Sequence, residues 1–142
     1  MTTIGKAMLG VVLAAVAAVG TAAPSPADDP PPPPAHQVTY VITAASPIWA
    51  DIYYLDQQPP KYSDYSHNPY QYTPNVQADI GPGHPWTSPQ VMLSDPYNYA
   101  MVVVSTGTEP GTPMFHCALV VDGKVVKSND GAKGTLCSLR SW

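Results

Sequence analysis

The chain has 142 residues, a length that fits one domain better than two. Hydrophobic residues make up 44% of it, enough for a packed core, while charged residues make up only 11%, against about 25% in ordinary soluble domains. Six lysines and arginines against ten aspartates and glutamates give a net charge of −4. This balance argues against a nucleic-acid-binding protein, which needs a basic footprint.

The first 23 residues have the pattern of a secretory signal peptide. Lys6 provides a basic start, residues 7–19 form a short apolar run, and small residues follow at 20–23. The alternative is an uncleaved membrane anchor, but the apolar run is shorter than the roughly 20 residues of a spanning helix. We therefore expect export, with cleavage after one of three alanines: Ala22, Ala23 or Ala27.

Residues 24–35 read PSPADDPPPPPA and are expected to be a proline-rich, disordered linker. Consecutive prolines favour the polyproline II conformation, which is extended and has no internal hydrogen bonds. The simplest interpretation is a stiff spacer between the export signal and the domain. A ligand for a proline-binding module is the alternative.

Residues 36–142 are expected to form a domain of short β-strands. β-Branched and aromatic residues occur in short runs that Pro, Gly, Asn and Asp separate, without sustained helical periodicity. Residues 95–98 (DPYN) have the composition of a turn. About seven strands at this spacing indicate an all-β sandwich. The predicted strands are 36–43, 47–55, 89–93, 99–106, 114–121, 124–128 and 135–140.

The strongest local signal is a hairpin around Asp122-Gly123, because this dipeptide suits the positive φ angles of a type I′ turn. A two-residue loop would pair Val120 with Val125 and Leu119 with Val126. Both faces of the hairpin are then partly apolar, and one of them faces the core. We expect another segment of the chain to cover the face with Val120 and Val125; contact with a partner is the alternative.

Cys117 and Cys137 are the only cysteines of the chain. Export would place them in an oxidising compartment, and each lies on an apolar strand face. We predict a disulfide that closes a loop of about 20 residues and stabilises the domain by roughly 3 kcal/mol. A metal or nucleophile site is the alternative, but two thiols without further nearby ligands make a poor zinc site.

Residues 56–83 are expected to form a long insertion without regular structure. Loops of this length are usually functional or mobile. Clustered tyrosines offer flat apolar area together with hydroxyl groups, which suits glycans, lipid headgroups or a protein partner. The equal alternative is that they lie on the sandwich as a lid over its core. The candidate contact residues are Tyr62, Tyr65, Tyr70 and Tyr72.

Motifs for catalysis or metal binding are missing from the sequence. It has no Gly-x-Ser-x-Gly elbow and no glycine-rich phosphate loop. Ser63, Asp64 and His67 are close in sequence, but a triad needs a rigid scaffold. The carboxylates of Asp51 and Asp56 could in principle act as acid and base, but Asp56 begins a loop, and a solvated aspartate is far more common. We therefore predict a non-enzymatic protein without metal or cofactor. The histidines, none at metal-helix spacing, are His36, His67, His84 and His116.

Three motifs resemble the mycobacterial MmpS family of small envelope proteins, which are associated with MmpL transporters of lipids and siderophores. These are Val-Thr-Tyr at 38–40, His-Pro-Trp at 84–86, and the most specific one, VVDGKVV at 120–126 between Cys117 and Cys137. The resemblance covers residues 38–55 and 84–139. It implies an immunoglobulin-like β-sandwich with a Cys117–Cys137 bridge.

Two features set the chain apart from that family: its cleavable start and its longer 56–83 segment. We therefore expect a divergent exported relative, secreted or associated with the envelope, with an MmpL-type transporter or an envelope lipid as its partner. The alternative is a free secreted module that binds a glycan, a lipid or a host protein. The predicted contact surface is either the tyrosine segment or the face with Val120 and Val125.

Overall fold

The computed structural model describes Gly20 and residues 30–141. Pro33–Trp142 forms one compact unit, distinct from Met1–Pro32. The predicted signal peptide lies outside the described residues except for Gly20. Of the predicted linker, residues 30–35 are described; they are exposed and belong to no helix or strand.

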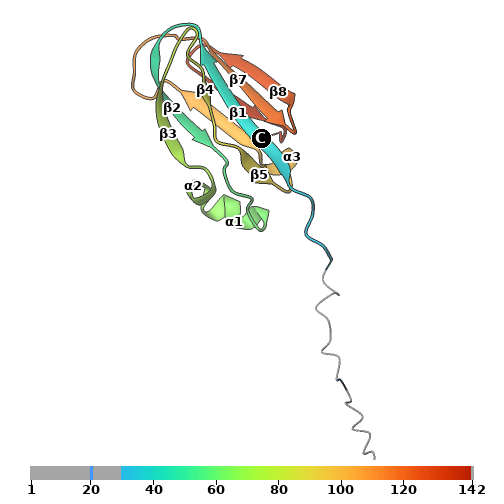
Figure 1. Ribbon diagram of the computed structural model, residues 1–142. Helices are drawn as coiled ribbons and strands as arrows, with labels where there is room; N and C mark the ends of the chain where they lie inside the picture. The colour runs from blue at the N-terminus through green and yellow to red at the C-terminus, as the bar shows by residue number, and fades with distance from the viewer. Residues whose placement is uncertain (1–19, 21–29, 142) are drawn as a thin grey trace, which may run out of the picture. The chain divides into compact units, whose positions relative to one another are not determined.

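The domain is a sandwich of two antiparallel sheets (Figure 1). The five-stranded sheet has the order β4-β1-β7-β8, and β5 pairs with β1. It comprises β1 (His36–Ala44), β4 (Trp86–Thr87), β5 (Val91–Leu93), β7 (Phe115–Val121) and β8 (Lys124–Gly131). The four-stranded sheet has the order β3-β2-β6-β9. It comprises β2 (Ile48–Tyr54), β3 (Asn75–Ile80), β6 (Met101–Ser105) and β9 (Gly134–Ser138). The predicted β-sandwich is confirmed.

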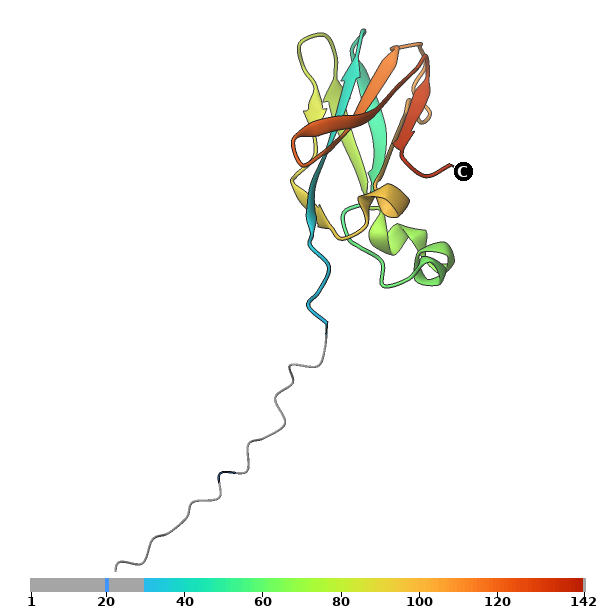
Figure 2. The ribbon, with the colours of Figure 1, turned by 90° about the vertical axis from the view of Figure 1, so that its right-hand side faces the viewer.

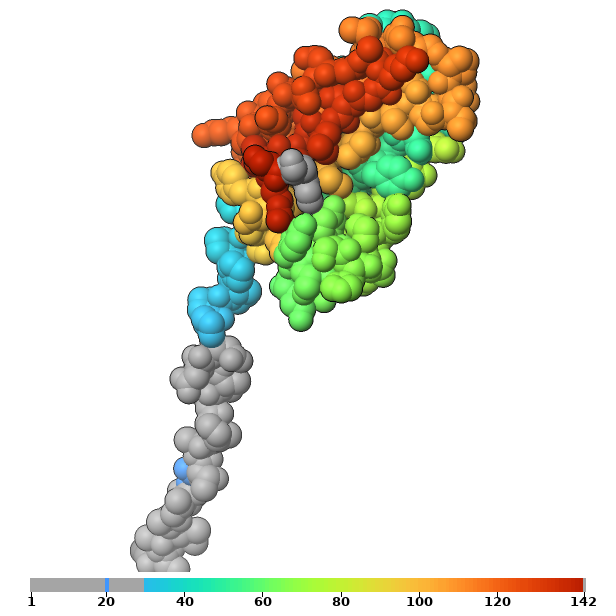
Figure 3. Space-filling view, turned by 180° about the vertical axis from the view of Figure 1, so that it is seen from behind, coloured from blue at the N-terminus to red at the C-terminus, as the bar shows by residue number. Residues whose placement is uncertain are grey.

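Three short helices lie at the end of the sandwich where β1 begins (Figure 2). They are α1 (Tyr62–His67), α2 (Pro69–Tyr72) and α3 (Pro96–Tyr99). The Asp95 carboxylate accepts a hydrogen bond from the Asn98 backbone N–H at the start of α3. The predicted turn at 95–98 is therefore a single helical turn. From behind, the α1–α2 segment lies beside the red residues that follow β9 (Figure 3), and Arg140 contacts Tyr62 there.

The core lies between the two sheets. Because side chains alternate along a strand, every second residue of the central strands points inward. Tyr40 is the largest fully buried side chain, and its hydroxyl donates a hydrogen bond to the Leu55 carbonyl at 2.7 Å. This bond satisfies a polar group that would otherwise be costly to bury. Other fully buried core residues are Val38, Ile42, Ile52, Val102, Val104, Phe115 and Leu119.

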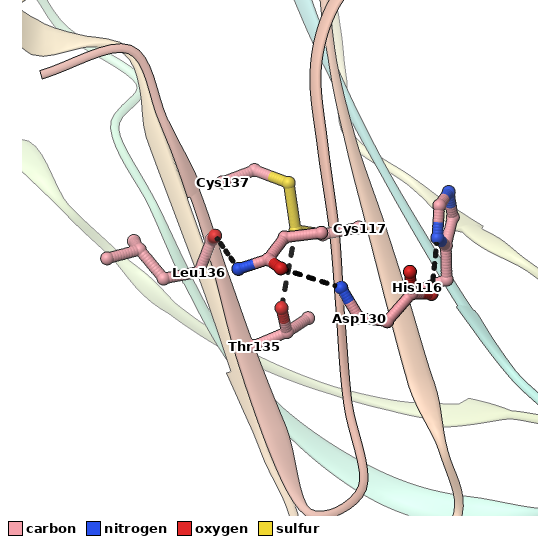
Figure 4. Close-up of polar contacts among 7 residues, drawn as sticks. His116, Cys117, Asp130, Thr135, Leu136 and Cys137 are labelled. Atoms are coloured by element: carbon pink, nitrogen blue, oxygen red, sulfur yellow. Dashed lines mark hydrogen bonds and ion pairs between the residues drawn. A yellow bond between two sulfur atoms is a disulfide. The ribbon is translucent and has the colours of Figure 1, made fainter.

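The predicted disulfide joins the two sheets. Cys117 of β7 is bonded to Cys137 of β9, and their Cα atoms are 6.0 Å apart. Both side chains are fully buried. Beside the bridge, the Asn129 side-chain amide donates to the Leu136 carbonyl at 3.2 Å, which ties β8 to β9 (Figure 4). The bridge and this bond together fix the sheets where β8 crosses over to β9.

The predicted hairpin connects β7 to β8. Asp122 and Gly123 have φ angles of 51° and 79°, as a type I′ turn requires. Val120 pairs with Val125 as predicted, but Leu119 pairs with Lys127 instead of Val126. A β-bulge between the Val120↔Val125 and Leu119↔Lys127 pairs inserts one extra residue into β8 and shifts the register. The strand also continues to Gly131, beyond the predicted end at residue 128.

The turn is fastened to the start of β1. Asp122 contacts the His36 imidazole at 2.6 Å and accepts a hydrogen bond from the Gln37 backbone N–H at 3.0 Å. These hydrogen bonds to the ionised form, first that of His36, lower the pKa of the Asp122 carboxyl. The hairpin therefore closes on the strand that enters the domain.

Two further expectations were wrong. Residues 56–83 are not irregular, because they contain α1, α2 and the edge strand β3, which pairs with β2 from Tyr53↔Asn75 to Ile48↔Ile80. The face with Val120 and Val125 is not covered by the chain either. Val125 is 64% exposed on β8, the edge strand of its sheet, whereas its partner Val120 on β7 is partly buried.

Candidate binding site

The four tyrosines of the predicted insertion fall into two pairs. Tyr65 and Tyr72 are buried and belong to the hydrophobic core. Tyr62 and Tyr70 are exposed, Tyr70 by 74% of its surface. Half of the cluster therefore covers the core, and the other half faces solvent.

The exposed side of this segment borders an open cleft on the outer face of β2 and β6. The cleft has a volume of about 330 Å³. Tyr53 and Tyr70 lie in tilted contact, with ring centroids 6.2 Å apart. The residues that line it are Tyr53, Tyr65, Pro69, Tyr70, Thr73, Met101 and Val103. The cleft is thus mainly aromatic and aliphatic.

The floor of the cleft is formed by Tyr53 of β2 and Val103 of β6, which face outward because side chains alternate along a strand. Ile52 and Tyr54 point into the core, so Tyr53 points outward. In β6, Val102 is buried for the same reason, and Val103 pairs directly with Tyr53 across the sheet. A cross-strand pair of an aromatic and a β-branched residue also stabilises the sheet that carries it.

The wall of the cleft is held by Tyr65 of α1. Its ring packs edge-on against Tyr99, with centroids 6.4 Å apart, and its hydroxyl lies 3.9 Å from the Met101 sulfur. Burial raises the pKa of Tyr65 above its ordinary value, so its hydroxyl stays protonated. Farther out, the Arg140 guanidinium lies 4.0 Å above the Tyr62 ring, a cation–π contact that links the chain end to α1.

The segment is anchored at its junctions with the sheet. The Tyr54 and Asp56 backbone N–H groups donate to the carbonyls of Pro74 and Tyr72, respectively. The Thr73 hydroxyl donates to the Pro69 carbonyl at 2.7 Å, at the end of α2. These bonds give the cleft wall a fixed position on the sandwich.

The side chains of three histidines, His36, His67 and His116, are paired with groups other than a nucleophile. His67 Nδ1 donates to the Ser63 backbone carbonyl at 2.6 Å, not to the Ser63 hydroxyl. His116 contacts Asp130 at 2.7 Å on the outer side of the β7–β8 pair (Figure 4). Within residues 30–141, no three or more His, Cys, Asp or Glu side chains are grouped to hold a metal ion. None of the helices described is long and apolar enough to cross a membrane.

Sequence reasoning missed the sheet half of the cleft, namely Tyr53, Met101 and Val103. The signal was present in the strand at 47–55, where Trp49, Asp51 and Tyr53 occupy the positions that alternate with the core residues. Outward-facing aromatic residues on a strand are a hint of a binding face. Considered together with the tyrosine segment at 56–83, these outward residues indicate a shared binding face.

The fold and this face define a small disulfide-linked β-sandwich domain with an aromatic cleft on one sheet. Comparison with known proteins places it in a family: the chain belongs to the family of the Rv2576c beta-sandwich domain, whose model matches residues 40–137. The predicted MmpS membership stays a prediction.

Mycobacterial relatives match over the whole chain. The uncharacterized protein Rv2576c of Mycobacterium tuberculosis strain H37Rv is 34% identical over 142 residues, which cover 100% of this chain and 91% of the relative. The uncharacterized proteins Mb2606c of Mycobacterium bovis and MT2652 of M. tuberculosis strain CDC 1551 match with the same identity and coverage.

Proposed function

We propose that this protein is an exported, non-enzymatic binding protein of the mycobacterial envelope that holds the aliphatic chain of a lipid in the tyrosine cleft. The observation that carries the proposal is the open cleft of about 330 Å³ between the α1–α2 segment and the outer face of β2 and β6. Each methylene group buried there contributes about 0.8 kcal/mol. Tyrosine rings offer flat apolar walls, and the flexible Met101 side chain adapts to a chain's shape.

The chemistry of the lining supports binding over catalysis. The residues that line the cleft include no carboxylate, imidazole, amine or thiol. Its ionisable groups are tyrosine hydroxyls, and burial raises the pKa of Tyr65 so that it stays neutral. Such a site lacks a general base near neutral pH, but it is well suited to removing hydrocarbon from water.

Replacing Tyr70 by alanine is expected to weaken binding of lauric acid by about tenfold, which corresponds to ~1.4 kcal/mol. The substitution removes one apolar wall while leaving the core intact, because Tyr70 is 74% exposed. Affinity is measured by titration of protein labelled on the methionine methyl groups. When lauric acid is added, the Met101 methyl signal should shift, because Met101 lines the cleft, while the signals of the exposed Met92 and Met114 should not.

Tyr97→Ala is the matched control, because Tyr97 is an exposed tyrosine of α3 that does not line the cleft. It should leave the affinity unchanged. Equal weakening by both substitutions, or a shift at Met92 in place of Met101, would contradict the proposed site.

A second candidate function is the MmpS-like one, an accessory protein that docks on an MmpL-type transporter. Val120 and Val125 support it, because they are paired neighbours on the outer face of the five-stranded sheet and Val125 is 64% exposed. Apolar side chains on an accessible face are typical of protein contacts.

Val120→Glu should abolish recovery of the transporter in crosslinking and co-purification from membranes, because it places a charge in the apolar contact. The melting transition of the purified domain should stay close to that of the wild type. Lys127→Glu serves as the control, since Lys127 is an exposed residue of the same hairpin. Unchanged recovery with Val120→Glu would remove the transporter from consideration.

A further inference from the structure

A second pocket opens on the four-stranded sheet, apart from the tyrosine cleft. It has a volume of about 290 Å³, and none of its lining residues belongs to the cleft. β2 contributes Trp49 and Asp51, β3 contributes Gln77, and the loop after β6 contributes Thr108 and Glu109. In contrast to the cleft, this pocket combines one aromatic ring with a set of polar side chains.

Trp49 supplies the apolar surface of the pocket. It lies between Ile48 and Ala50, which point toward the core, and therefore faces outward with 45% of its surface exposed. Asp79 lies directly opposite on β3. A large indole surface that remains in water gains free energy when a ligand with an apolar face covers it.

Asp51 is held in place beside the indole. Its Oδ1 accepts a hydrogen bond from the Asn75 side-chain amide at 2.6 Å. Gly107 lies close to this carboxylate: with a φ of 58°, it has no side chain, and a Cβ at its position would lie 3.9 Å from the Asp51 Oδ2. The glycine therefore leaves the Asp51 carboxylate uncovered on this side, and both residues line the pocket.

The loop that closes the pocket is ordered by backbone hydrogen bonds. The Glu109 N–H donates to the Thr106 carbonyl at 2.9 Å, and the Thr106 N–H donates to the Lys133 carbonyl at 3.1 Å. The Gly107 N–H donates to the Ser105 hydroxyl at 3.2 Å. A pocket arranged before the ligand arrives loses less conformational freedom on binding.

The chemistry of these groups matches a sugar ring. A pyranose has a face of C–H groups, which stacks on an indole, and an edge of hydroxyls, which donate to carboxylates and both donate to and accept from an amide. We propose that this pocket binds a neutral sugar, stacked on Trp49 and hydrogen-bonded by Asp51 and Gln77.

Charge narrows the class of sugar. Asp51 and Glu109 line the pocket, and no Lys or Arg of the described residues does. Sugars that carry phosphate or carboxylate are therefore repelled. A simple organic cation would use the ring and the carboxylates alone, whereas the Gln77 amide and the Thr108 hydroxyl add donors and acceptors that a polyhydroxyl ligand engages.

The test is a titration of the full-length protein, followed by the indole N–H resonances, with maltose, cellobiose and trehalose up to tens of millimolar. The Trp49 resonance should shift saturably with at least one of them, while that of the half-buried Trp86 stays in place. Trp49→Ala should weaken binding by at least about tenfold, Gln77→Leu by about threefold to tenfold, and Trp49→Phe should restore part of the affinity.

Tyr70→Ala separates this inference from the proposed lipid site, because it alters the cleft and should leave sugar binding unchanged. If none of the three sugars shifts Trp49, or if Trp49→Ala binds them as the wild type does, the sugar site is refuted. A saturable shift with tetramethylammonium chloride alone would likewise overturn it in favour of a cation pocket.

Discussion

Replacing Cys117 and Cys137 together by alanine is expected to lower the free energy of unfolding by about 2–5 kcal/mol. The two cysteines are 20 residues apart in sequence and link β7 to β9 across the sandwich. Without the bond, the unfolded chain regains the conformational entropy of that loop. The fully buried sulfur atoms also leave space in the core that no longer has packing partners.

Urea unfolding of four samples measures this effect: the wild type and the double variant, each with and without reductant. Reductant should lower the unfolding midpoint of the wild type and leave that of the double variant unchanged. The reduced wild type isolates the contribution of the covalent bond, and the double variant adds the loss of packing. Equal midpoints for oxidised and reduced wild type would show that the bond contributes nothing to stability.

Replacing Tyr40 by phenylalanine is expected to cost about 1–3 kcal/mol of folding stability near neutral pH. The Tyr40 hydroxyl donates to the Leu55 carbonyl at 2.7 Å in the core. Phenylalanine keeps the ring and its packing against Tyr54, whose centroid lies 5.8 Å away, but it leaves the Leu55 carbonyl buried without this donor. The cost therefore comes from a polar group and not from a cavity.

The same substitution should change how stability depends on alkaline pH. Burial raises the pKa of Tyr40 above its ordinary value of 10.0. Above that pH the unfolded chain releases the Tyr40 hydroxyl proton, while the folded protein keeps it. The contribution of Tyr40 to folding stability is therefore fully present below about pH 10 and declines as the pH rises further. Tyr40→Phe removes this titration, and its stability should decline less steeply above pH 10 than that of the wild type.

Unfolding midpoints in urea, measured below and above pH 10, test this prediction. Tyr97→Phe is the control, because Tyr97 is an exposed tyrosine outside the core. It should follow the wild type at every pH. Tyr54 and Tyr65, whose pKa values are also raised by burial, are present in every sample, so an identical alkaline slope for Tyr40→Phe would mean that Tyr40 does not contribute.

The candidate site was only half accessible to sequence reasoning. The tyrosine cluster was found because four tyrosines stand out from a proline-rich segment by composition alone. The other half, Tyr53 with Met101 and Val103, lies on β2 and β6, which are far apart in the sequence but joined by the Tyr53↔Val103 pair. Pairing partners of distant strands are not written in either strand, because many registers satisfy the same alternation.

The β3 strand was missed for a related reason. Val76, Ala78 and Ile80 alternate with polar residues, but the pattern is short and follows a segment rich in proline and tyrosine. Its inward side chains are stabilised by pairing with β2, so the strand depends on a neighbour. The composition of this segment favoured a loop, but pairing with β2 makes it a strand.

The features determined by the sequence itself are those with local causes. Alternation along the chain defines β1 and β2, runs of apolar and β-branched residues define β6 and β7, and Asp122-Gly123 suffices for a type I′ turn. Apolar strand faces around both cysteines predicted the bridge. The tertiary structure alone decided the bulge at Val126 of β8, the exposure of Val125 and the meeting of Tyr53 with Tyr70. Each of these depends on how segments pack against one another, a choice set by the free energy of the whole packed domain and not by any one stretch of chain.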